Sequence, residues 1–161
     1  MQFRLFITAL AMTFLAITPA YADSSATGIF GEKISIPTAN LKNAKTVVVN
    51  GKSFDETVGI YLAYCVVPKQ GALPTPCGGG ANKSGIGDAS YWISSNPPPY
   101  GTGLAIPFKP GGRFTQKLDI SKKIGAFDCT KVACAITVRS DHLHAGDRTH
   151  DLFIPITFSK K

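Results

Sequence analysis

Short runs of strand-forming residues recur along the chain, and turn-forming residues separate them. One run, from residue 113 to residue 120, alternates: Phe114, Leu118 and Ile120 share one parity and polar residues occupy the other. Successive side chains of a strand point to opposite faces, so this alternation predicts a sheet with one buried and one solvated face. The predicted strands are Lys33–Ile36, Thr46–Asn50, Val58–Val67, Leu104–Phe108, Arg113–Ile120, Ala133–Ser140 and Leu152–Phe158.

Helical periodicity is weak after the first residues of the chain. Gly and Pro interrupt almost every window, and turn signals such as Asn50-Gly51 lie between the strand-forming runs. Short strands with turns between them favour an all-β sandwich or barrel. The chain has 161 residues, a length that suits one domain. We therefore expect a single all-β domain with little helix.

One segment, residues 68–101, departs from this rhythm. It contains six prolines, seven glycines and few strand formers. A long irregular stretch inside a compact domain is uncommon and is usually functional or disordered. We predict a long Gly/Pro-rich loop here.

Three aromatic residues lie within this predicted loop: Tyr91, Trp92 and Tyr100. Trp92 is the only tryptophan of the chain. Aromatic side chains on a loop supply rigid contact surface for a ligand, but they also serve as a local core on which a large loop packs. We name all three as candidate ligand-binding residues and leave both interpretations open.

The first 22 residues have the layout of a secretory signal peptide. A cation, Arg4, precedes the apolar run Leu5–Ile17, and Pro19 is followed by the small-x-small sequence Ala20-Tyr21-Ala22. The apolar run is shorter than the roughly 20 residues that a membrane helix needs. We predict cleavage after residue 22 and one domain over residues 23–161. The product would be secreted, with no membrane span, and at most loosely associated with the cell wall.

The charge of the mature chain is positive. Removing Arg4 leaves 16 Lys and Arg against 10 Asp and Glu, a net charge of +6. Such a charge attracts polyanions such as nucleic acid, teichoic acids or lipid headgroups. The cations are dispersed along the sequence rather than blocked, which favours an ordinary solvated surface over a dedicated polyanion site.

The four cysteines indicate two disulfides. An even count in an exported chain is typical of oxidised pairs, although four cysteines allow three connectivities. Pairing sequence neighbours closes the two shortest loops, and we favour it. The spacing fits no zinc signature well. The cysteines are Cys65, Cys77, Cys129 and Cys134.

All three histidines fall between residues 140 and 151, with three aspartates and two arginines nearby. If the preceding strand continues, His142 and His144 project from one face, where imidazoles can share a metal. The alternatives are a pH-sensitive binding patch that includes His150, and a charged turn in which Asp side chains bond local backbone. We favour the charged turn and assign no metal and no cofactor.

The stretch 125–136, Gly-Ala-Phe-Asp-Cys-Thr-Lys-Val-Ala-Cys-Ala-Ile, resembles the neocarzinostatin family of secreted actinobacterial proteins, as does the final run Ile154–Phe158. Upstream, Val47-Val48-Val49 and the region from Gly59 to Cys65 are similar to early strands of that family. The resemblance covers most of residues 34–158, and the chain is longer than the family in its central loop.

This resemblance implies an immunoglobulin-like antiparallel β-sandwich of about seven strands, in which each disulfide closes a local loop. Founding members hold an enediyne chromophore in a cleft between the sandwich and a smaller hairpin region. The resemblance therefore implies a cleft near both disulfides. It fixes a scaffold better than a ligand, because one fold hosts many functions.

No catalytic motif accompanies this scaffold. A Gly-x-Ser-x-Gly elbow, a His-Glu-x-x-His helix and a phosphate-binding glycine loop are all absent from the sequence. We expect a monomeric, non-enzymatic binding protein whose cleft and long loop receive a small apolar ligand or a protein partner. The alternative is a cationic, envelope-associated or antimicrobial protein that binds cell-wall polymers or DNA.

Overall fold

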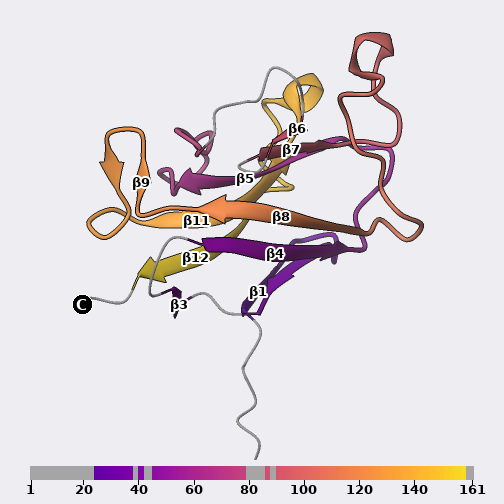
Figure 1. The fold of residues 1–161 in the computed structure, drawn as a ribbon. Coiled ribbons are helices and arrows are strands. Elements are labelled where there is room, and N and C mark those ends of the chain that lie inside the picture. The colour runs from indigo at the N-terminus through magenta and orange to yellow at the C-terminus, as the bar shows by residue number, and fades with distance from the viewer. Residues whose placement is uncertain (1–23, 38–39, 42–44, 79–85, 88–89, 159–161) are drawn as a thin grey trace, which may run out of the picture.

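The computed structural model describes residues 24–37, 40–41, 45–78, 86–87 and 90–158. Two β-sheets pack face to face within this part of the chain (Figure 1). The predicted signal peptide lies outside the described residues. No helix in the described part is both long enough and apolar enough to cross a membrane.

The first sheet has four antiparallel strands in the order β1-β2-β4-β8. Its longest pair, β4 and β8, places Val47 opposite Leu118 and Gly51 opposite Phe114. The apolar parity of β8 faces the core, as the alternation predicts. The strands are β1 (Ser24–Thr27), β2 (Lys33–Ile36), β4 (Lys45–Lys52) and β8 (Phe114–Ile120).

The second sheet has six strands in the order β3-β12-β11-β5-β7-β6, and a separate β9-β10 hairpin lies beside it. All pairings in it are antiparallel except the short contact of β3 with β12. Its strands are β3 (Asn40–Leu41), β5 (Ile60–Val66), β6 (Ile86–Gly87), β7 (Ser90–Ile93), β11 (Cys134–Ser140) and β12 (Leu152–Phe158). The hairpin consists of β9 (Lys123–Ile124) and β10 (Phe127–Asp128).

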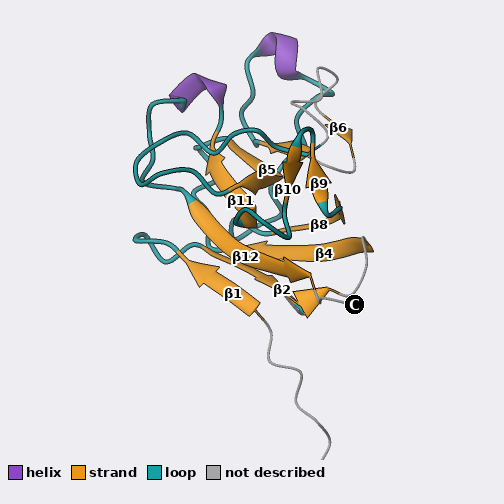
Figure 2. Cartoon of the chain, turned by 90° about the vertical axis from the view of Figure 1, so that its left-hand side faces the viewer, coloured by secondary structure: helices purple, strands orange, loops and turns teal. Residues whose placement is uncertain are grey.

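Helix is confined, within the described residues, to two 3₁₀ turns: η1 (Pro99–Gly101) and η2 (His142–His144). Figure 2 shows both turns at the same end of the sandwich. The architecture is therefore the predicted all-β antiparallel sandwich, and the described part of the chain contains eight strands of four or more residues where about seven were expected.

The core lies between the two sheets. Apolar side chains from both inner faces interdigitate there, and burial of this apolar surface is the main stabilising contribution. The most deeply buried of them include Ile34, Val49, Leu62, Ile93, Leu118, Ile136, Val138 and Ile154.

The predicted strand over Leu104–Phe108 is wrong. Only Ile106 pairs, in an isolated bridge with Ile93. The next residue is Pro107, which has no backbone N–H to continue a ladder, and the residues before Ile106 form turns. The segment therefore pairs with β7 at one residue only and does not continue as a strand of the sheet.

The predicted loop, residues 68–101, is interrupted by β6, β7 and η1. The four residues of β7 pair with β5 across their whole length. Gly and Pro flank this short strand on both sides, so the sequence pattern does not predict it. Pairing with β5 supplies the stabilisation that the local strand propensity does not provide.

The disulfides join sequence neighbours, as predicted. Cys65 pairs with Cys77, 12 residues away, and Cys129 pairs with Cys134, 5 residues away. The first bridge ties the chain after β5 back onto that strand, and the second closes the turn before β11.

Removing each disulfide should lower the free energy of unfolding in proportion to the logarithm of its loop length. We expect a loss of about 3 kcal/mol for Cys65→Ser with Cys77→Ser, and about 2 kcal/mol for Cys129→Ser with Cys134→Ser. Urea unfolding of each double variant beside the oxidised protein measures both losses. A larger loss at the shorter loop would contradict the loop-entropy explanation.

Candidate functional site

A row of large polar and aromatic side chains crosses the outer face of the six-stranded sheet, the face that points away from the four-stranded sheet. Arg139 on β11 lies opposite Tyr61 on β5, and Tyr61 lies opposite Trp92 on β7. The core-facing residues of β5 are Ile60 and Leu62, so Tyr61 has the outward parity. Register alone therefore brings these three side chains into one row.

Ring and charge contacts connect the members of this row. The guanidinium carbon of Arg139 lies 4.9 Å from the centroid of the Tyr61 ring. The Tyr61 and Trp92 rings are tilted, with centroids 6.3 Å apart. Burial is the main cause that raises the pKa of Tyr61, and the Asp141 carboxylate raises it further. Tyr61 is therefore a neutral phenol at physiological pH.

His142 connects this row to the end of the sandwich. Its Nδ1 lies 2.6 Å from the Tyr61 hydroxyl, and its Nε2 lies 2.7 Å from the Tyr100 hydroxyl. When the imidazole is neutral it has one donor and one acceptor, so one tyrosine then donates to the ring and the other accepts from it. The edge of the imidazole contacts Trp92, at 4.9 Å between centroids. We call Tyr61, Trp92, Tyr100 and His142 the aromatic–histidine cluster.

The cluster has a buried base and an exposed edge. Trp92 is 4% exposed, whereas Tyr100 is 60% exposed. The two rings are stacked at 26° with centroids 6.4 Å apart. Gly101 permits this contact, because a Cβ there would lie 2.4 Å from the Trp92 ring. The result is a fixed aromatic platform at the surface.

Asp141 holds the cluster from below. Its carboxylate is fully buried and accepts two hydrogen bonds, from the Trp92 indole N–H at 3.0 Å and from the Leu143 backbone N–H at 3.0 Å. Its own backbone N–H donates to the Gly59 carbonyl at 2.9 Å. A Cβ on Gly59 would lie 2.0 Å from the carboxylate, so only glycine fits there. The hydrogen bond from the Leu143 backbone N–H caps η2 and so sets the position of His142.

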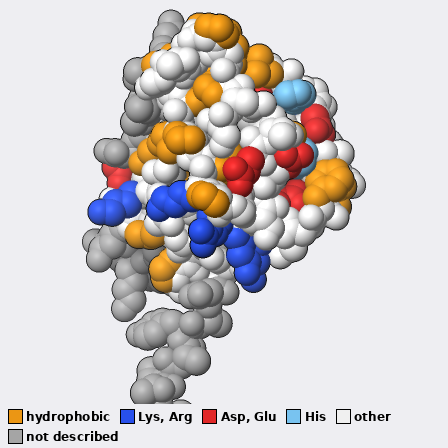
Figure 3. All heavy atoms as spheres, turned by 90° about the vertical axis from the view of Figure 1, so that its right-hand side faces the viewer, with side chains coloured by type: hydrophobic (Ala, Val, Ile, Leu, Met, Phe, Trp, Pro, Cys, Tyr) orange, Lys and Arg blue, Asp and Glu red, His pale blue; other side chains and the backbone are white. Residues whose placement is uncertain are grey.

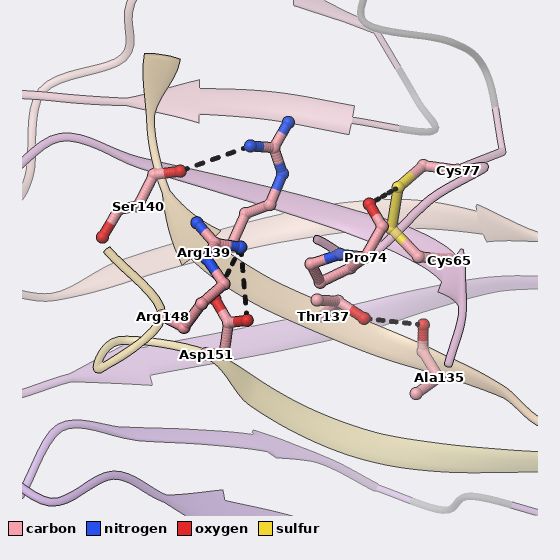
Figure 4. Close-up of a disulfide and its surroundings, with 9 residues drawn as sticks. All are labelled: Cys65, Pro74, Cys77, Ala135, Thr137, Arg139, Ser140, Arg148 and Asp151. Carbon is pink, nitrogen blue, oxygen red and sulfur yellow. Dashed lines mark hydrogen bonds and ion pairs between the residues drawn. A yellow bond between two sulfur atoms is a disulfide. The ribbon is translucent and has the colours of Figure 1, made fainter. Parts of the chain in front are cut away.

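Arg139, which packs on the Tyr61 ring, has a second arginine near it, Arg148 (Figure 4). Arg148 reaches the Asp151 carboxylate at 3.2 Å and 3.3 Å, and donates to the Ala145 carbonyl at 3.0 Å. Burial lowers the pKa of Arg139, and the positive charge of Arg148 is the next largest cause. Burial raises the pKa of Asp151 in spite of both arginines. The two guanidinium groups therefore lie close enough to repel.

The Cys65–Cys77 disulfide lies farther along the same face. Cys65 is opposite Ala135, and Ala63 is opposite Thr137. Figure 4 shows the bridge beside Pro74 and near Ala135 and Thr137. The side chains between the disulfide and the arginines on this face are therefore small: Ala63, Ala135 and Thr137. The cleft expected beside both bridges stays a prediction.

The structure separates the three aromatic residues proposed from sequence. It brings Trp92 and Tyr100 together in the cluster. Tyr91 has the opposite parity and enters the core, where its hydroxyl donates to the Lys117 carbonyl at 2.6 Å. Tyr91 therefore does not belong to the exposed platform.

The strand that would align His142 with His144 ends before them. Asp141 adopts an extended conformation and caps η2, so the two histidines lie on a 3₁₀ turn. His144 is exposed, with Nδ1 at 3.6 Å from the Asp141 carboxylate. The condition for both imidazoles to project from one strand face is therefore not met, and the favoured charged-turn interpretation agrees with the structure.

His150 lies apart from the cluster, between two carboxylates. Its Nδ1 is 3.5 Å from the buried Glu32, and its Nε2 is 3.8 Å from Asp147. Hydrogen bonds from the Thr149 hydroxyl and backbone N–H lower the pKa of Asp147. Among the described residues, no group of three or more His, Cys, Asp or Glu side chains is arranged to hold a metal ion.

Sequence patterning missed three members of this site: Tyr61, Arg139 and Asp141. Tyr61 and Arg139 lie in correctly predicted strands, but their proximity depends on the β5–β11 register, which a single strand does not encode. The one available signal for Asp141 was its place directly after a strand, where Asp commonly begins a helical turn.

The fold has a counterpart among solved structures. The chain is similar to macromomycin with a TM-score of 0.51 and 17% sequence identity, over 80% of this chain and 99% of the macromomycin chain. This chain has a neocarzinostatin-like fold. No protein-family model matches its sequence, and no curated protein sequence is significantly similar to it. The likeness to macromomycin concerns the fold alone.

Replacing Asp141 should destabilise the neocarzinostatin-like fold more than replacing an exposed aspartate. Asp141→Ala removes the cap of η2 and leaves the Trp92 indole N–H buried without its acceptor, a loss of about 3 kcal/mol. Urea unfolding followed by Trp92 fluorescence measures it. Asp55→Ala is the control, because that carboxylate bonds Thr57 in an exposed turn. Equal losses would contradict the role of Asp141.

Proposed function

We propose that this protein is a secreted, non-catalytic binding protein that presents the aromatic–histidine cluster to a small molecule with a flat ring. One observation carries the proposal: the exposed ring of Tyr100 is stacked on Trp92 and its hydroxyl is fixed by His142. Aromatic faces bind flat apolar groups, and a ring that is already immobilised loses little conformational entropy on binding.

The hydrogen bonding of the cluster favours binding over catalysis. Both ring nitrogens of His142 contact tyrosine hydroxyls, and the Asp141 carboxylate is engaged by Trp92 and Leu143. A general base or nucleophile needs a side-chain atom that can reach the substrate. Here the polar groups hold the rings in place instead.

Secretion as a monomer is part of the same proposal. Two disulfides are typical of proteins from oxidising compartments, and they support the export that the predicted signal peptide implies. The resemblance of the sequence to the neocarzinostatin family supplies a precedent for binding a small aromatic molecule on this fold.

A second candidate function, polyanion binding, rests on the four-stranded sheet. Lys33 on β2 lies directly opposite Lys52 on β4, an unfavourable pairing of like charges in the absence of an anion. Figure 3 shows lysine and arginine side chains near one another on one part of the surface, with acidic side chains beside them and the histidines farther away.

Ring binding predicts a loss of affinity when the exposed platform is removed. We expect Tyr100→Ala to weaken the binding of 2-naphthamide, a neutral probe, by about tenfold, the effect of losing one stacking partner. The indole N–H resonance of Trp92, the single tryptophan, reports binding by NMR. Phe30→Ala is the matched control, because Phe30 is an aromatic residue exposed to a similar degree as Tyr100 and lies in the turn between β1 and β2 of the four-stranded sheet. Equal effects of the two substitutions, or no binding by the unsubstituted protein, would refute the proposal.

Polyanion binding predicts steep salt dependence. The mature protein should be retained on heparin at low ionic strength and elute as salt rises, because cation–phosphate and cation–sulfate contacts release counterions. Lys33→Gln with Lys52→Gln should elute at lower salt. Passage of the unsubstituted protein through the column at low salt would exclude this second function.

A further inference from the structure

Arg139 has more hydrogen-bond donors than the described structure uses. A guanidinium carries five N–H donors and cannot accept. Among the described residues, Arg139 makes one hydrogen bond, from Nη1 to the Ser140 carbonyl at a long 3.5 Å, and otherwise packs on the Tyr61 ring. It is half-buried, and none of its nitrogens is among the enclosed polar atoms without a partner, so its remaining donors are open to solvent or to a ligand.

Arg148 is also incompletely bonded. Its Nη1 and Nη2 atoms contact Asp151 and Ala145, but Nε is buried with no hydrogen-bond partner. A buried N–H without an acceptor is unfavourable, and such groups are rare in native proteins. Nε is enclosed and out of reach of a ligand, but Nη1 and Nη2 carry four N–H donors between them. Both arginines therefore have donor capacity for one more acceptor group.

The charges around Arg139 and Arg148 favour an anion as the additional acceptor group. Two carboxylates, Asp151 and Asp141, lie near Arg139, but its neighbour Arg148 affects it more than either of them. Asp141 is already occupied by Trp92 and Leu143, and Asp151 by Arg148. A further negative charge would relieve the repulsion between the guanidinium groups.

We propose that Arg139 and Arg148 bind a carboxylate of the same ligand whose ring lies on the aromatic–histidine cluster, so that the ligand class is a small aryl carboxylic acid. This inference rests on the proposed function. Carboxylate is the group whose two oxygens match the planar fork of a guanidinium. Arg139, Tyr61 and Trp92 lie side by side on three adjacent strands, and adjacent strands are about 5 Å apart. This spacing sets the distance between the carboxylate and the ring of the ligand.

The test compares two probes of the same shape, 2-naphthoate and its neutral amide, 2-naphthamide. We expect the unsubstituted protein to bind the carboxylate about tenfold more tightly than the amide at neutral pH and low salt, the preference expected of a charge-assisted hydrogen bond. The readout is the ratio of the two dissociation constants, from calorimetry and from the Trp92 indole resonance.

Three variants assign this preference to the arginine pair. Arg139→Gln and Arg148→Gln should each bring the ratio close to one, and Arg139→Lys, which keeps the charge but not the fork, should give an intermediate ratio. Asp151 loses its partner when Arg148 is changed, and Arg148→Gln could fail to fold for that reason. In that case the two Arg139 variants alone test the proposal. Arg113→Gln is the control, because Arg113 is exposed beside β8 and donates to the Pro110 carbonyl.

The outcomes separate this inference from the proposed function. If both probes bind equally and both lose affinity in Tyr100→Ala, the ring site stands and the carboxylate site is refuted. If neither probe binds, both proposals fail together. A loss of preference in Arg113→Gln as large as in Arg139→Gln would assign the effect to overall charge and would also refute the site.

Discussion

The buried carboxylate of Asp141 is the contact on which the exposed site depends. It accepts the indole N–H of Trp92 and the backbone N–H of Leu143 in η2, so a single side chain fixes the platform ring and the turn that carries His142. A buried carboxylate is tolerated only when it is well hydrogen-bonded. The close approach of Gly59 encloses this carboxylate and is possible only because that residue lacks a Cβ. The aromatic–histidine cluster is consequently held in place by contacts within the chain itself.

The core determines the outer face through strand register. Because side chains alternate along a strand, the inward positions of Leu62 and Val138, which lie opposite one another, oblige Tyr61 and Arg139 to point outward and to meet. A slip of one residue between β5 and β11 would bury a guanidinium, which alone costs several kcal/mol, and would expose core residues to water. The apolar core therefore specifies the geometry of the polar site.

Sequence patterning was sufficient where structure is local. The runs Lys33–Ile36 and Leu152–Phe158 coincide with β2 and β12, and the disulfides join neighbouring cysteines. Sequence patterning failed where a neighbouring strand determines whether a segment becomes a strand. Four residues framed by Gly and Pro form β7 because β5 pairs with them, whereas Leu104–Phe108, a better strand by composition, contains Pro107 and makes one bridge. The site combines β5, β7, η1 and η2, and their meeting is a tertiary property that no single window of sequence contains.

The similarity to macromomycin and the character of the site concern different parts of the molecule. A shared fold requires that inward positions remain apolar and that the backbone path be kept, and 17% identity is compatible with both. Outward residues such as Arg139 and Tyr61 contribute little to the core, so they can vary while the sandwich persists. A row that runs from guanidinium to phenol to indole is a property of this chain's own outward residues. For that reason the ligand is better inferred from these side chains than from the fold.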